Sequence, residues 1–355
     1  MVANYDLFSR MLHGLALGNR SIAEASFSIE QSIGKFNPAL VLHLRHVFIS
    51  GLARAGTTIL MRRFYSTGLF RLLTYRDMPF VLMSNLWHKL SGVSRKNIGL
   101  TERAHGDGIF VDFDSPEALD EVFWRVFYGD SYIFDDHLGP MVASQEDIER
   151  FRRYVASVLR ARETCELRYL SKNNNNVLRL QAIYDAFPNA LIIVPFRDPV
   201  QHAFSLLRQH QRFVADQAGD AFVRRYMTWL CHHEFGSDHR PFRFEAGIIP
   251  HKQGSIDYWL FIWRDVYRHL ERTMPEGAIF LAYENLCRQT DAVWARLQQL
   301  ADITPNAGNV FEPLDPRFRR TDPITDVALL EECNVIYARM VERMNADVIA
   351  QSEKS

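Results

Sequence analysis

The stretch HVFISGLARAGTTILMRRF, residues 46–64, constrains the fold of this chain more than any other. An apolar run ends at Gly51, a short loop follows, and Gly56-Thr57-Thr58 opens a helical pattern. A buried strand, a glycine loop and a helix in this order direct backbone N–H groups and the positive end of the helix dipole at one point. We therefore predict an anion site whose contacts are made by five consecutive residues: Arg54, Ala55, Gly56, Thr57 and Thr58.

The spacing of the two glycines matches a Walker A loop, but Thr57 stands where that motif has its lysine. The Walker lysine neutralises the β- and γ-phosphates of a nucleoside triphosphate. A loop without it is better suited to a 5′-phosphate group than to a triphosphate. A tight strand-to-helix turn that binds nothing is the alternative at this point.

A second strand-to-helix transition occurs in FPNALIIVPFRDPVQHAFSLLRQH, residues 187–210. Arg197 and Asp198 follow the apolar run, Pro199 suits a first helical turn, and Ser205 falls on the second turn. Ligands of open parallel sheets bind at the carboxyl ends of the strands. We predict that Arg197 and Ser205 hold one phosphate, with an Arg–Asp pair that merely caps the helix as the alternative.

Further apolar runs of strand length alternate with helical patterns, which predicts an α/β fold: a P-loop-NTPase-like parallel sheet flanked by helices. The strand-like runs include FRLLTY around Leu72, LRYL before Ser171 and AIFLAY at 278–283. Two stretches, about 79–165 and 212–257, break this rhythm and are interpreted as helical or loop insertions over the carboxyl edge of the sheet. Residues 1–44 are expected to be helical, and 1–355 to form a single domain.

Charge and composition exclude several classes of function. Lys and Arg number 41 against 42 Asp and Glu, and this balance argues against a nucleic-acid or membrane-surface partner. No apolar run reaches the length of a membrane span, and the first residues lack the pattern of a secretory signal. Four widely separated cysteines predict neither a disulfide framework nor a zinc site. A cytoplasmic protein is expected, and its oligomeric state is not predicted.

Together the two anchors resemble the sulfotransferase family that uses 3′-phosphoadenosine 5′-phosphosulfate (PAPS). The family's 5′-phosphosulfate loop is matched by Gly51 to Thr58, and its 3′-phosphate element by Arg197 to Ser205. Tyr283-Glu284-Asn285-Leu286 resembles another strand end of the family, and the likeness covers roughly residues 45–70 and 165–320. The resemblance implies in-line transfer of a sulfuryl group from PAPS to a hydroxyl or amine, on a small-molecule or carbohydrate acceptor. It implies no metal.

Lys172 follows the strand-like run LRYLS and precedes Asn173–Asn176. The resemblance implies that this lysine contacts the transferring sulfuryl group, where charge develops in the transition state. A solvated lysine in a polar loop is the alternative. Cytosolic members carry a histidine two residues later, but here that residue is Asn174, which cannot accept a proton. The chain therefore resembles tyrosylprotein and carbohydrate sulfotransferases more closely, and its base must lie elsewhere.

The candidate bases are residues that could lie within hydrogen-bond reach of the acceptor hydroxyl. We predict Asp77, which follows a strand, and His105, which sits in a glycine-flanked loop. Glu102 is a further candidate. Glu117 and Glu121, four residues apart, are expected on a solvated helix face.

The resemblance also implies that a late basic loop, Arg317–Arg320, covers the adenine and the 3′-phosphate. Arg317 and Arg319 would bind the phosphate and Phe318 would stack on the base. The group His232, His233, Glu234 and His239 lacks the spacing of a metal motif, so no metal is predicted. The aromatic residues between Phe123 and Phe134 suit either a ring-bearing acceptor or the core.

Two rival functions stay open at this point. One is a P-loop kinase, against which the missing Walker lysine weighs. The other is a non-catalytic nucleotide-binding protein, which would not need Lys172 or Arg54.

Overall fold

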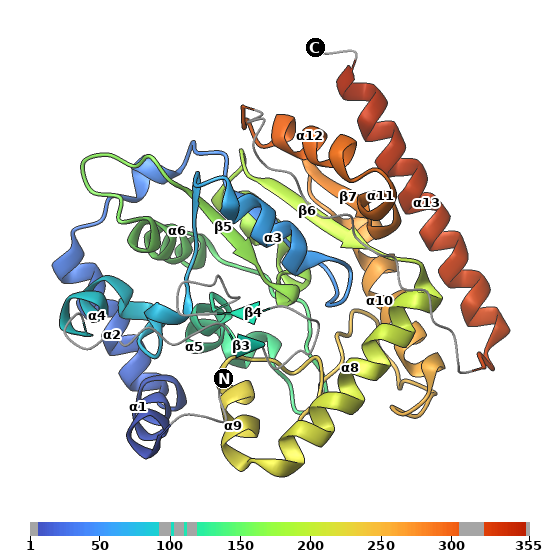
Figure 1. Ribbon diagram of the computed structural model, residues 1–355, viewed down its shortest axis with the longest axis horizontal. Helices are drawn as coiled ribbons and strands as arrows, with labels where there is room; N and C mark the ends of the chain where they lie inside the picture. The colour runs from blue at the N-terminus through green and yellow to red at the C-terminus, as the bar shows by residue number, and fades with distance from the viewer. Residues whose placement is uncertain (1–5, 92–100, 103–109, 112–118, 305–322, 353–355) are drawn as a thin grey trace.

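The computed structural model describes residues 6–91, 101–102, 110–111, 119–304 and 323–352. Its centre is a five-stranded sheet with the order β2-β5-β1-β6-β7, in which all pairings are parallel (Figure 1). The strands are β1 (Val47–Ile49), β2 (Phe70–Arg71), β5 (Arg168–Lys172), β6 (Leu191–Phe196) and β7 (Ala278–Ala282). A separate antiparallel pair is formed by β3 (Thr101–Glu102) and β4 (Phe110–Val111).

Helices cover both faces of this sheet, which confirms the predicted α/β class with a P-loop-like arrangement. In chain order they are α1 (Leu7–Gly18), α2 (Arg20–Gly34), α3 (Thr57–Ser66), α4 (Ser84–Ser91), α5 (Glu121–Tyr132), α6 (Gln145–Leu159), α7 (Leu180–Ala186), α8 (Pro199–Gly219), α9 (Ala221–Trp229), α10 (Ile256–Thr273), α11 (Tyr283–Arg288), α12 (Thr290–Leu300) and α13 (Val327–Ser352). Short 3-10 turns are η2 (Pro38–Val41), η3 (Tyr75–Asp77), η4 (Val81–Met83) and η5 (Asn174–Leu178). No helix of the described residues is long and apolar enough to cross a membrane.

Alternate strand residues divide the core into two layers, because successive side chains of a strand point to opposite faces. Val47, Ile49 and Ile193 pack with α3 and α12 on one face. Phe48 and Ile192 pack on the other face, where α6, α7, α8 and α10 lie. All six residues of β6 are buried, as expected for a central parallel strand.

The two neighbouring strands β1 and β6 send their following helices to opposite faces of the sheet. Helix α3 follows β1 and contributes to one core layer, whereas α8 follows β6 and contributes to the other. Such a reversal opens a crevice at the carboxyl ends of the two strands, and this is where ligands bind in open α/β sheets. The topology therefore brings both predicted anchors to one place.

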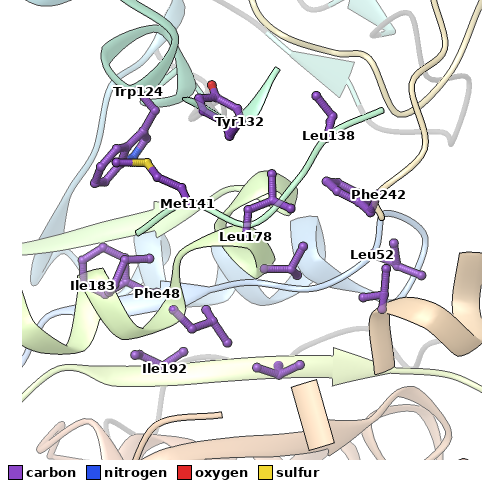
Figure 2. Close-up of a cluster of buried hydrophobic side chains, with 14 of the residues drawn as sticks. Phe48, Leu52, Trp124, Tyr132, Leu138, Met141, Leu178, Ile183, Ile192 and Phe242 are labelled. Atoms are coloured by element: carbon purple, nitrogen blue, oxygen red, sulfur yellow. The ribbon is translucent and has the colours of Figure 1, made fainter. Parts of the chain in front are cut away.

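The segment between β2 and β5 extends the core beyond the sheet. Figure 2 shows Phe48 and Ile192 of the sheet on the same side-chain cluster as Leu178, with Trp124 and Tyr132 of α5 farther out. Helix α6 packs on the face of the sheet, where the ring of Phe151 lies 6.3 Å from that of Phe48. Part of this segment thus belongs to the helical layer itself.

Several element boundaries differ from the sequence-based expectation. Only Phe70–Arg71 of the run FRLLTY forms a strand, because a capping box between Thr74 and Asp77 turns the chain into η3. The run NNVLRLQAIYDAF, residues 175–187, has a helical pattern, but its α-helix starts only at Leu180, after the 3-10 turn η5. The N-terminal helical segment is two helices, since Asn19 caps the start of α2 through its side chain.

Candidate functional site at the carboxyl edge of the sheet

The loop between β1 and α3 has the backbone of an anion cradle. Arg54 and Gly56 both have positive φ, 74° and 86°, and Gly56 is the N-cap of α3. Residues in this conformation turn successive N–H groups inward, and the helix that begins at Thr57 adds its dipole. Gly51 is also required, since a Cβ there would lie 2.7 Å from the carbonyl oxygen of Pro195. The predicted strand, loop and helix are therefore confirmed in position.

His202, on α8, makes a hydrogen bond to the backbone of this loop. Its Nε2 donates a hydrogen bond of 2.7 Å to the carbonyl oxygen of Ala53. Burial lowers the pKa of His202 to about 3, and the nearby charges of Arg197 and Arg54 add to this effect. The imidazole is therefore a neutral donor that ties the loop to α8. No local sequence pattern singles out this histidine.

Arg54 and Ser205 join the two predicted anchors into one site. The Nε of Arg54 donates to the Oγ of Ser205 at 3.1 Å, across 151 positions of the chain. The loop after β1 and the helix after β6 were predicted separately, and their side chains meet directly. Arg54 therefore lies between the loop and the second anchor.

Arg197 lies at the end of β6 over the ring of Tyr283, with its guanidinium carbon 4.9 Å from the ring centre. The side chain is largely buried, and its Nε makes no hydrogen bond within the described residues. A buried guanidinium with unused donors suits a phosphate. Tyr283 also touches the loop, since a Cβ on Gly56 would lie 2.9 Å from its ring. The donor set thus fits a ligand with two phosphate groups.

Glu284 fixes the turn that carries Arg197. Its Oε1 accepts a hydrogen bond of 3.0 Å from the backbone N of Asp198, and its Oε2 accepts one of 3.2 Å from the hydroxyl of Tyr337. Asp198 in turn caps α8 through the N–H of Gln201. The motif at residues 283–286 indicated this strand end, but the role of Glu284 in fixing the turn follows only from its contacts.

Lys172 is the last residue of β5 and is largely buried, at 8% exposure. It is aligned with Ile49 of β1, two residues before Gly51, and the N–H of Asn173 donates to the carbonyl oxygen of Ile49 at 3.1 Å. The backbone of Lys172 therefore lies beside the start of the anion loop. It is not the solvated loop lysine that was the alternative.

The expectation of a solvated face at Glu121 is wrong. Glu121 is buried and pairs with the buried Arg179, at 3.0 Å between Nη2 and Oε1. It also accepts hydrogen bonds from Asn173, at 2.6 Å, and from the hydroxyl of Tyr132. A carboxylate can be buried when a guanidinium and further donors replace its water. Glu121 anchors the asparagine run behind Lys172.

The candidate base Asp77 serves as a local cap. It accepts hydrogen bonds from the backbone N–H and the hydroxyl of Thr74, and His88 Nε2 lies 3.2 Å from its Oδ1. Burial opposes ionisation, but the hydrogen bonds from His88 and Thr74 outweigh it and lower the pKa of Asp77. A carboxylate stabilised in this way is a weak proton acceptor.

Other predicted site residues lie outside the described part of the chain. These are His105, Glu117 and the late basic loop with Arg317, Phe318, Arg319 and Arg320. Glu102 lies in β3, and only its backbone is described.

The aromatic residues of α5 belong mainly to the core. Phe123, Trp124 and Tyr132 are buried, and Phe123 stacks on Tyr154. Among the aromatic residues considered for contact with a ring-bearing acceptor, Phe134 is exposed. Among the described residues, no group of three or more His, Cys, Asp or Glu side chains is placed to hold a metal ion.

Comparison with known families agrees with this architecture. A profile of the sulfotransferase family matches residues 46–306, a span that includes the anion loop, Lys172, Arg197 and Tyr283. The chain belongs to the sulfotransferase family.

Three solved structures are similar to this chain at low identity. Sulfotransferase STF1 from Mycobacterium tuberculosis H37Rv is 13% identical with a TM-score of 0.47, covering 82% of this chain and 76% of that one. Sulfotransferase STF9 from Mycobacterium avium is 17% identical with a TM-score of 0.42, covering 86% and 76%. A sulfotransferase from Alicyclobacillus acidocaldarius is 16% identical with a TM-score of 0.33, covering 85% and 94%. No curated protein sequence matches the chain significantly.

Proposed function

We propose that this protein transfers a sulfuryl group from PAPS to a hydroxyl or amine of a small-molecule or carbohydrate acceptor. The observation that carries the proposal is the 3.1 Å contact between Arg54 and Ser205, which joins the two predicted phosphate anchors of this sulfotransferase-family chain into one site. When bound, PAPS would supply the activated sulfuryl group and a nucleotide leaving group. The cytoplasmic location stays a prediction.

Each anchor has a role toward this donor. The loop Arg54–Thr58 would hold the 5′-phosphate side, because its N–H groups and helix terminus favour an anion. Arg197 and Ser205 would hold the 3′-phosphate, since the buried Nε of Arg197 is otherwise unpaired within the described residues. Arg317 and Arg319, with Phe318 on the adenine, remain predictions from the resemblance.

Lys172 is proposed as the cation that stabilises charge on the oxygens around sulfur during transfer. Its position beside the start of the loop supports this role, as does its burial, because a fixed cation in a partly desolvated site acts strongly on developing charge. Arg54 would assist from the other end of the loop. Of the predicted bases, Asp77 is a poor candidate because of its lowered pKa, and His105 remains a prediction.

The rival kinase function requires a triphosphate, whereas the proposed function requires a nucleotide with separate 3′- and 5′-phosphates. Titration calorimetry should detect tight binding of adenosine 3′,5′-bisphosphate and much weaker binding of ATP.

Arg197→Ala should weaken the binding of the bisphosphate by about 2–4 kcal/mol, because a charge-assisted bidentate contact is lost. Arg208→Ala removes an exposed arginine of α8, the helix that follows Arg197, and should bind like the wild type.

Transfer of label from sulfur-labelled PAPS to a panel of phenols, sugars and amines then tests the reaction itself. Preference for ATP would favour the kinase. Binding of the bisphosphate without any transfer or hydrolysis of PAPS would favour a non-catalytic nucleotide-binding protein.

A further inference from the structure

The reaction proposed above needs a proton acceptor near Lys172, and Asn174 cannot serve. The segment Cys231–Glu234, which follows α9, lies directly against this asparagine run. Asn174 donates from Nδ2 to the Oε1 of Glu234 at 3.1 Å, and Asn175 donates to the carbonyl oxygen of Cys231 at 3.3 Å. The segment that carries His232 is therefore held against the asparagines that stand two and three residues after the end of β5.

The same segment also borders the anion loop. Glu234 and Phe242 line one pocket together with Leu52 and Ala53 of the loop. Figure 2 shows Leu52 and Phe242 side by side, on the loop and on the segment that follows the histidines. Glu234 is thus placed between the end of β5 and the loop that follows β1, the two elements between which the reacting group would lie.

Glu234 and His232 form an acid–imidazole pair at this position. The Nδ1 of His232 lies 3.7 Å from the Oε1 of Glu234, and their side chains are 21% and 12% exposed. Burial opposes ionisation of Glu234, but His232 and Asn174 outweigh it and hold its pKa at about 2. The carboxylate is therefore charged at neutral pH and lies on the Nδ1 side of the ring. Catalytic contacts of this kind are often long in ligand-free structures.

The neighbouring histidines, His233 and His239, have structural contacts instead. His239 contacts the hydroxyl of Tyr258 through Nε2 at 3.0 Å, and its Nδ1 lies 3.1 Å from the carbonyl oxygen of His233. Burial lowers the pKa of His239 to about 3 and also lowers that of His233. Both rings are therefore neutral parts of the fold, and His232 is the imidazole that is paired with the carboxylate.

We propose that His232 is the general base of this enzyme and that Glu234, anchored by Asn174, is its positioning residue. This inference rests on the proposed sulfuryl transfer. The acceptor hydroxyl gives its proton to Nε2 of His232 while its oxygen forms a bond to sulfur. The bond between sulfur and the 5′-phosphate oxygen breaks, and that oxygen keeps the electron pair. The resulting imidazolium is stabilised by Glu234 and later loses its proton to water.

Kinetics with two phenols would test the role of His232. Phenol must lose its proton during attack, whereas 4-nitrophenol is a much stronger acid that is partly ionised near neutral pH and needs a base much less. His232→Gln should lower kcat for phenol at least about 100-fold, with a much smaller loss for 4-nitrophenol. The acidic limb of the kcat–pH profile for phenol should also disappear. The rate at which PAPS is hydrolysed, with water as the acceptor, should also fall in His232→Gln. This rate can be measured even if the enzyme accepts neither phenol.

Matched variants separate positioning from structure. Glu234→Gln should lower kcat for phenol about tenfold. Glu234→Asp keeps a carboxylate and should have a higher kcat than Glu234→Gln. The kcat of Asn174→Ala should lie between those of Glu234→Gln and the wild type. KM should change little in each. His137→Gln breaks another histidine–carboxylate pair, with Asp136 at 2.7 Å, and should leave kcat unchanged. Equal losses for the two phenols, or a normal kcat in His232→Gln, would overturn the proposal.

A measurement without turnover provides an independent test. In histidine-labelled protein, the ring resonance of His232 is assigned by its loss in His232→Gln. Addition of adenosine 3′,5′-bisphosphate should shift this resonance but not that of His137, and His232→Gln should bind the nucleotide like the wild type. An unshifted His232 resonance in a protein that binds the nucleotide would refute the placement. If the wild type neither binds the nucleotide nor consumes PAPS, the proposed function itself fails.

Discussion

At the scale of single residues, this protein buries several ionisable groups and controls each one through its neighbours. His202 is neutral because burial and two arginines disfavour its cation. The pKa of Asp120, just before α5, shifts in the opposite direction. Burial raises it to about 6, and the charge of Glu121 adds to this effect. It keeps hydrogen bonds from Ser171 and Tyr169, but its Oδ1 has no partner within the described residues.

Asp120 should therefore make stability depend on pH. Its pKa in the folded state, about 6, lies above the ordinary value of 3.8, so ionisation costs more in the folded protein than in the unfolded chain. Stability from this group is present at low pH and is lost as the pH rises from about 4 through 6. Asp120→Asn should gain up to roughly 3 kcal/mol relative to the wild type as the pH rises from about 3.5 to 7.

Urea denaturation of the two proteins across this pH range measures the difference. Asp130→Asn, at an exposed position of α5, is the control and should follow the wild type at every pH. A stability difference between Asp120→Asn and the wild type that does not change with pH would show that Asp120 is not a buried, weakly ionised group.

At the scale of elements, the anion loop depends on close contact between segments far apart in sequence. Gly56 ends the loop at a φ of 86°, and Tyr283, the residue that follows β7, packs against it. Tyr283 is in turn covered by Arg197. The loop, the end of β6 and the end of β7 therefore support one another, and a change at Gly56 should affect the nucleotide site more than the fold.

Gly56→Ala should lower the affinity for adenosine 3′,5′-bisphosphate at least about tenfold. Alanine disfavours the positive φ by about 1–2 kcal/mol, and its Cβ would push against the ring of Tyr283. Gly68→Ala is a matched control, because Gly68 has a φ of 74° and nothing lies within 4 Å of its Cβ position. The control should lose a similar stability but keep its affinity, as measured by calorimetry and thermal melts. The same affinity in Gly56→Ala and the wild type would contradict the argument.

At the scale of the whole molecule, buried polar contacts connect the segment between β2 and β5 to the sheet edge. Glu121 of α5 contacts Asn173 after β5 and Arg179 before α7. The guanidinium of Arg179 also lies over the rings of Trp124 and Tyr132. The buried carboxylate of Glu121 and its partners thus help to attach α5 to the end of β5.

Glu121→Ala should destabilise the protein by about 3–5 kcal/mol, since it leaves Arg179 buried without a counter-charge. Asp130→Ala breaks an ion pair with Arg20 on the exposed side of the same helix and should leave the denaturation midpoint near that of the wild type. Guanidinium denaturation followed by tryptophan fluorescence measures both. Equal effects of the two substitutions would mean that burial does not determine the strength of the Glu121 pair.

The local pattern of the sequence predicted the central strands, the glycine loop and the positions of Arg197 and Ser205, because a strand-to-helix turn depends on residues close together in the chain. It could not show that Arg54 meets Ser205 across 151 positions, or that Glu234 meets Asn174 across 60. Sequence also placed Glu121 in water, whereas packing buried it beside Arg179. Burial and charge partners depend on which distant segments pack together, and only the tertiary structure decides that. For this reason the nucleotide site was predicted from the sequence, while the pairing of His232 with Glu234 followed from the structure.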